Sequence, residues 1–81
     1  MQVLAFDDDP IVLALYSAVL TKLGVEFECH PEASRAMTLI GRHKPRLVVL
    51  DIMMPPVDGI TLCKAIKTDP MTRETPVIIS S

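Results

Sequence analysis

Four short apolar runs alternate along the chain with three segments whose apolar residues have helical spacing. The runs cover residues 3–6, 25–29, 47–50 and 76–80. Short runs rich in branched side chains are typical of strands buried on both faces of a parallel sheet. The run at 25–29 alternates apolar and acidic residues instead, which predicts an edge strand with one side in water. Strand and helix thus alternate throughout, and we expect right-handed crossovers between parallel strands.

The first helix is predicted over residues 10–23. Asp9 can cap it, Pro10 suits its first position, and Gly24 is the usual residue type at a helix end. Its inward stripe is expected to consist of the apolar residues at positions 12, 15, 16, 19 and 23. Because Ser17 is the one polar residue between positions 11 and 20, we expect this helix to be buried on more than one side.

The other two helices are predicted over residues 32–42 and from an Asp58 cap to residue 67. Lys44-Pro45 ends the second helix, because the residue before a proline is disfavoured in helical conformation. A polar loop at 68–75 then leads to the last strand. Gly59, directly after the cap, is expected to serve local backbone geometry or close packing.

Acidic residues follow two of the predicted strands directly. Asp7 and Asp8 come after the first strand, and Asp51 comes after the third. Open α/β sheets bind ligands beyond the carboxyl ends of their strands, so these three carboxylates should meet at one edge. Carboxylates about 4 Å apart repel by about 4 kcal/mol per pair at an effective dielectric constant of about 20. Oxygen ligands suit Mg²⁺ or Mn²⁺, so the sequence predicts a divalent cation site there.

A carboxylate at such a site can accept a phosphoryl group, because a divalent cation neutralises the charge that gathers on the phosphoryl oxygens. Asp51 is the candidate acceptor, and a backbone carbonyl just after it could add a further metal ligand. Ser81 follows the last strand and should place a hydroxyl at the same edge. Asp9 and Asp58 are interpreted as helix caps and not as ligands.

The composition excludes several other classes. A chain of 81 residues makes at most one domain, and 49% hydrophobic residues exclude disorder. A net charge of −2 without a basic patch argues against direct nucleic-acid binding. Cys29 and Cys63 fit no zinc or redox spacing and are expected to be free thiols in a reducing compartment. We see no signal peptide or membrane span, so we expect a cytoplasmic protein.

Three segments of the chain carry a family resemblance. They are Leu-Ala-Phe-Asp-Asp-Asp-Pro at 4–10, Leu-Asp-Ile-Met-Met-Pro-Pro-Val-Asp-Gly at 50–59, and Pro-Val-Ile-Ile-Ser-Ser at 76–81. In these segments the chain resembles the receiver domains of bacterial two-component response regulators. The resemblance extends over all 81 residues and implies a single, partial receiver domain. It also implies a flavodoxin-like, doubly wound parallel sheet with strand order 2-1-3-4.

The resemblance implies a role for each site residue. Asp51 would be the phosphoacceptor, Asp8 a direct Mg²⁺ ligand, and Asp7 a ligand acting mainly through water. Met53 would bind the metal through its backbone carbonyl, and Ser81 would be the switch hydroxyl. The donor would be a sensor histidine kinase or a phosphotransfer protein, and an unknown output domain would respond. Such a module is not an enzyme, although small phosphodonors can label it.

Receiver domains continue beyond the position of Ser81, with a fifth strand that ends in a lysine and with two more helices. The 81 residues lack these elements, so the fourth strand would be an exposed edge and we expect self-association. Two alternatives stay open. One is a haloacid-dehalogenase-type phosphatase with Asp7 and Asp9 as catalytic residues. The other is an inert receiver fragment that acts by protein interaction.

Overall fold

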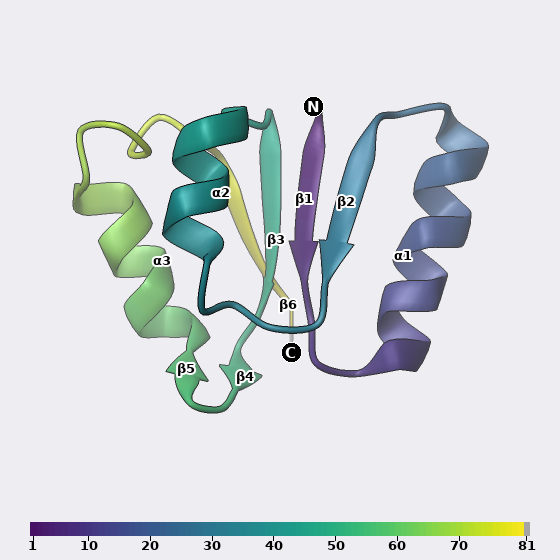
Figure 1. Ribbon diagram of the computed structural model, residues 1–81, viewed down its shortest axis with the longest axis horizontal. Helices are drawn as coiled ribbons and strands as arrows, with labels where there is room; N and C mark the ends of the chain where they lie inside the picture. The colour runs from purple at the N-terminus through teal and green to yellow at the C-terminus, as the bar shows by residue number, and fades with distance from the viewer. Residues whose placement is uncertain (81) are drawn as a thin grey trace.

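A four-stranded parallel sheet lies between two layers of helix in the computed structural model, which describes residues 1–80 (Figure 1). The strands of this sheet are β1 (Val3–Phe6), β2 (Phe27–His30), β3 (Leu47–Asp51) and β6 (Val77–Ser80). Their order is β2-β1-β3-β6, and every neighbouring pair is parallel. Because β6 is the fourth of these strands along the chain, the predicted order 2-1-3-4 of a flavodoxin-like sheet is confirmed.

The helices divide between the two faces of the sheet. Helices α2 (Ala36–His43) and α3 (Gly59–Thr68) cover one face, and α1 (Pro10–Leu23) covers the other (Figure 1). The main core lies on the side of α2 and α3. Its fully buried side chains are Leu4, Phe6, Ala36, Ile40, Val48, Leu50 and Ile66.

The predicted caps of α1 and α3 are confirmed. The Asp9 side chain accepts a hydrogen bond from the Ile11 backbone N–H at 2.9 Å, and Asp58 accepts one from the Ile60 N–H at 2.9 Å. Gly24 ends α1 in the left-handed conformation, with φ of 72°. These local signals bring both helices back toward the sheet at the predicted positions.

The predicted burial of α1 is wrong in part. None of its residues is buried, and Leu15, Val19 and Leu23 of the expected inward stripe are 60%, 56% and 68% exposed. The half-buried positions are 12, 13, 16, 17 and 20, so two positions of the expected stripe, 12 and 16, are among them. A helix that is apolar almost all round has no strong periodic signal, so its inward face could not be chosen from spacing alone.

No helix among residues 1–80 is long and apolar enough to cross a membrane.

Two elements start at least two residues later than predicted. The strand expected at 25–29 is β2 at Phe27–His30, because the Val25 N–H still completes the end of α1 by donating to the Leu20 carbonyl at 3.2 Å. The helix expected from residue 32 begins at Ala36. Residues 32–35 form a turn in which the Ser34 hydroxyl bonds the Glu32 carboxylate and caps no helix.

A short antiparallel ribbon between β3 and α3 was not predicted. It consists of β4 (Met53–Met54) and β5 (Val57–Asp58), joined through Pro55 and Pro56 with a cis peptide bond between them. The ribbon lies at the same end of the molecule as the carboxyl ends of the strands (Figure 1). Strands of two residues show no periodicity, so a hydrophobic pattern cannot reveal them.

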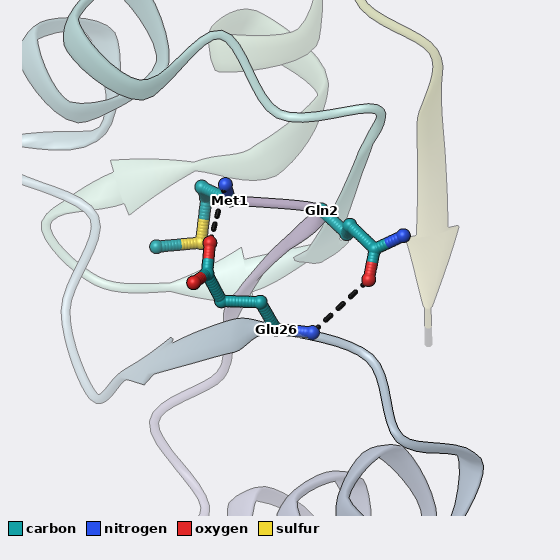
Figure 2. A network of polar contacts seen from close by, with 3 residues as sticks. All are labelled: Met1, Gln2 and Glu26. Carbon is teal, nitrogen blue, oxygen red and sulfur yellow. Dashed lines mark hydrogen bonds and ion pairs between the residues drawn. The ribbon is translucent and has the colours of Figure 1, made fainter.

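The opposite end of the sheet is held by polar contacts between the starts of β1 and β2. The Met1 ammonium lies 2.5 Å from a carboxylate oxygen of Glu26, and the Glu26 N–H donates to the Gln2 side-chain oxygen at 3.1 Å (Figure 2). The Met1 ammonium lowers the pKa of Glu26 by hydrogen bonding and by its charge. These contacts align β1 with β2 at the end away from the acidic residues.

Candidate functional site

Two central strands bring the predicted carboxylates together. β1 and β3 are neighbours, with Phe6 opposite Leu50, so the residues that follow each strand meet at one edge of the sheet. Asp7, Asp8 and Asp51 each offer a carboxylate oxygen, and these oxygens all lie within 4.8 Å of one another. We call these three residues the acidic cluster. The convergence predicted from the two strand ends is thus present.

The members of the acidic cluster differ in exposure. Asp7 is 5% exposed, Asp51 is half-buried and Asp8 is exposed. Burial raises the pKa of Asp7, and the negative charges of Asp51, Asp8 and Asp9 raise it further. The Asp9 backbone N–H donates to Asp7 Oδ1 at 2.9 Å and opposes this rise, because it stabilises the carboxylate. The ionised form of Asp7 is therefore destabilised by its surroundings, and a cation bound beside it would stabilise that form.

Side chains do not supply that cation. Among residues 1–80, no lysine or arginine nitrogen lies within 4.0 Å of a carboxylate oxygen. Oxygen donors of this kind suit Mg²⁺, whose octahedral ligands lie about 3–4.2 Å apart with bonds of about 2.1 Å. The 4.8 Å limit fits a site in which some of the carboxylates act through water, so the residues present fit such an ion.

Gly59 and the end of β6 determine where the Asp51 backbone lies. A Cβ atom on Gly59 would lie 2.3 Å from the Asp51 carbonyl oxygen, so only glycine fits against this peptide. The Gly59 N–H donates to the Ile52 carbonyl at 3.0 Å, and the Ile52 N–H donates to the Ser80 carbonyl at 3.0 Å. The Asp51 carboxylate itself accepts a long hydrogen bond of 3.3 Å from the Met53 N–H. The predicted close-packing role of Gly59 is confirmed.

The remaining predicted residues divide into three groups. Asp9 and Asp58 cap helices, as predicted, and lie outside the acidic cluster. Met53 belongs to the ribbon and its side chain is 70% exposed, while metal binding by its carbonyl stays a prediction. Ser81 lies outside the described residues, so its role as switch hydroxyl also stays a prediction.

Sequence reasoning missed two contacts close to the site. The His30 ring stacks on Phe6 with ring centres 5.5 Å apart, and its Nε2 lies 3.0 Å from Glu28 Oε1. The Tyr16 hydroxyl donates to the Ser80 hydroxyl at 3.2 Å. The sequence held two signals for the second contact, a serine in an otherwise apolar strand and a tyrosine on a helix. A hydroxyl on an apolar face needs a hydrogen-bond partner.

Comparisons with known proteins agree with this architecture. The model of the response regulator receiver domain family matches residues 3–81. The response regulator PleD of Caulobacter vibrioides is 35% identical over 78 residues, which are 96% of this chain and 17% of PleD. The signal transduction histidine-protein kinase BarA of Shigella flexneri is 36% identical over 78 residues, which are 96% of this chain and 8% of BarA.

A solved structure gives the same result for the fold. The N-terminal domain of a response regulator receiver protein from Methanoculleus marisnigri superimposes with a TM-score of 0.89 at 33% identity. The match covers 96% of this chain and 63% of that structure, so the chain spans less than two thirds of each of these relatives. The chain belongs to the family of response regulator receiver domains.

Proposed function

We propose that Asp51 accepts a phosphoryl group from a sensor histidine kinase or a phosphotransfer protein, with Mg²⁺ or Mn²⁺ bound at the acidic cluster. The observation that carries the proposal is the convergence of three carboxylates from two neighbouring strands within 4.8 Å. An acceptor has to lie beside the metal and also reach a donor in solution. Asp51 meets both requirements because it is half-buried, whereas Asp7 is almost completely enclosed.

In the proposed transfer, a carboxylate oxygen of Asp51 forms a bond to phosphorus. The bond between phosphorus and the donor's imidazole nitrogen breaks, and that nitrogen keeps the electron pair. The bound cation would neutralise charge on the phosphoryl oxygens, and Asp7, Asp8 and the Met53 backbone carbonyl would hold it together with Asp51. The Ser81 hydroxyl would donate a hydrogen bond to a phosphoryl oxygen.

Family membership supports a proposal about the setting of this reaction. Relatives of this chain include a protein named as a response regulator and one named as a histidine-protein kinase, which supports a role in two-component signalling. We therefore propose that residues 1–81 belong to one receiver domain, which regulates an output and has no catalytic turnover of its own. We further propose that it works in the cytoplasm and binds neither nucleic acid nor membrane directly.

The test is labelling with a small phosphodonor. The chain is incubated with phosphoramidate and Mg²⁺, and the adduct is mapped by mass spectrometry. We expect one acid-stable, alkali-labile adduct on Asp51, and no labelling of Asp51→Asn. Asp58→Asn is the matched control, because asparagine caps a helix as well as aspartate and Asp58 lies outside the acidic cluster.

Three results would count against the proposal. Labelling of Asp51→Asn would place the acceptor elsewhere. Continuous hydrolysis of a generic phosphate ester would favour the phosphatase alternative. Failure of the wild-type chain to form any adduct, although it is folded and binds Mg²⁺, would favour an inert receiver fragment that acts by protein interaction.

A further inference from the structure

We infer that Tyr16 is a positioning residue for Asp51, acting through its hydrogen bond to Ser80. The inference rests on the proposed function, since it concerns the phosphorylation of Asp51. Tyr16 is in the middle of α1, the helix that follows Asp7 and Asp8, and Ser80 is the last residue of β6. Their hydroxyls are 3.2 Å apart, with Tyr16 as the donor.

Ser80 is in direct contact with the backbone of the acceptor. It lies opposite Asp51 in the ladder between β3 and β6, and its carbonyl accepts from the Ile52 N–H at 3.0 Å. A displacement of Ser80 therefore moves the peptide that joins Asp51 to Ile52. The Asp51 carboxylate has little to resist this movement, because its hydrogen bond from the Met53 N–H is long at 3.3 Å.

On the side of α1, the hydrogen bond from Tyr16 holds the end of β6. Within residues 1–80, β6 pairs with β3, and its Val77 and Ile79 pack against the core on the side of α2 and α3. On the other side, Ile78 is 53% exposed, and the Tyr16 bond is the side-chain hydrogen bond that joins α1 to β6 within residues 1–80. From the side of α1, this bond therefore restrains Ser80, the residue that lies opposite the acceptor.

The Tyr16 side chain lies in apolar surroundings. Tyr16 lines an apolar groove of about 460 Å³ between α1 and the sheet, together with Val3, Ala5, Leu15 and Val49 among others. A hydroxyl in such surroundings is costly without a partner, so Tyr16 and Ser80 favour one arrangement of helix and strand. Phosphoryl transfer depends on positions held within a fraction of an ångström, so this arrangement should affect its rate.

The test uses a matched pair at each position. Ser80→Thr keeps the hydroxyl, and Ser80→Val has nearly the shape of Ser80→Thr but no hydroxyl. Tyr16→Phe removes the hydrogen-bond donor. With phosphoramidate and saturating Mg²⁺, we expect Ser80→Val and Tyr16→Phe to label Asp51 roughly three- to tenfold more slowly than wild type. The double variant should be no slower than either single variant, and Ser80→Thr should recover most of the wild-type rate. Circular dichroism at the assay temperature shows that each variant is folded.

A second readout uses the fact that Tyr16 is the only tyrosine and the chain has no tryptophan. Intrinsic fluorescence therefore reports on Tyr16 alone, and we expect it to change when Asp51 is phosphorylated in wild type and Ser80→Thr but not in Ser80→Val. Equal labelling rates in folded wild type and Tyr16→Phe would overturn the inference and leave the proposed function intact. An equal fluorescence change in wild type and Ser80→Val would also overturn it. A wild-type chain that is never labelled would overturn the proposed function and the inference with it.

Discussion

Replacing Gly59 with alanine should destabilise the fold and displace Asp51, whereas the same replacement at Gly41 should stabilise the fold. A Cβ at position 59 would lie 2.3 Å from the Asp51 carbonyl oxygen and 2.9 Å from Ile52 Cα. Both are backbone atoms, one at the last residue of β3 and one at the residue that follows it, so neither can turn away as a flexible side chain would. At Gly41, in the last turn of α2, nothing lies within 4 Å of the added atom.

The magnitudes follow from these contacts. Ordinary van der Waals distance at position 59 requires the strand or α3 to move by about 1 Å, and overpacking of this kind costs about 1–3 kcal/mol. Gly41→Ala should gain about 0.5–1 kcal/mol, because alanine has the higher helix propensity. The two variants should therefore differ by about 1.5–4 kcal/mol. For a domain of this size, each kcal/mol changes the melting temperature by about 4–8 °C.

The assay combines urea unfolding at one protein concentration with labelling of Asp51. Gly24→Ala supplies a second control, because φ of 72° makes alanine strained there without any contact to the site. We expect Gly24→Ala to lose stability and keep its labelling rate, and Gly59→Ala to lose both. A Gly59→Ala variant as stable as Gly41→Ala would show that the packing of α3 on Asp51 is looser than the structure indicates. Normal labelling in a destabilised Gly59→Ala would refute the link to the acceptor.

Three further predictions concern charge and association. Millimolar Mg²⁺ should raise the melting temperature of wild type, because a ligand bound only to the folded state stabilises it, and an equal rise in Asp8→Asn would contradict the site. The pKa of Asp7 is raised above its ordinary value of 3.8, so the folded state without metal should lose stability as the pH rises from 3.8 through the raised pKa. Urea titrations at several pH values measure this loss, and we expect it to be smaller in Asp7→Asn. The 81-residue chain by itself should self-associate, because Ile78 on β6 and Leu15 beside the apolar groove are 53% and 60% exposed. Light scattering that finds a stable monomer at tens of micromolar would refute this prediction.

The features that sequence predicted well each depend on a local signal. A buried strand of four residues followed by aspartate identifies both its own end and the edge of the sheet where the carboxylate lies, as at Phe6-Asp7 and Leu50-Asp51. A cap such as Asp9 needs only the backbone of the next turn. The acidic cluster followed from these signals and from one assumption about which strands are neighbours.

The features that sequence missed depend on contacts between distant segments. The inward face of α1 is determined by the sheet on which it packs, and its own pattern was uninformative because apolar residues surround the helix. The hydrogen bond between Tyr16 and Ser80 joins residues 64 positions apart, so no local pattern could reveal it. The need for glycine at position 59 also depends on a tertiary contact, because the carbonyl oxygen that excludes a side chain there belongs to Asp51.

The direction of the helices determines which positive groups lie near the acidic cluster. Each helix begins at the edge where the strands end, so the helix N-termini lie near the cluster, and basic residues such as Lys22, Arg42 and Lys67 lie in the last turns at the far end. This arrangement suits the helix dipoles, whose effect is confined to the first and last turn. It places these three basic residues at the end away from the carboxylates, and no lysine or arginine of residues 1–80 pairs with any carboxylate of the cluster. The same topology that assembles the acceptor site thus leaves its charge to be balanced from solution, which is why occupancy by a divalent cation and stability should be coupled.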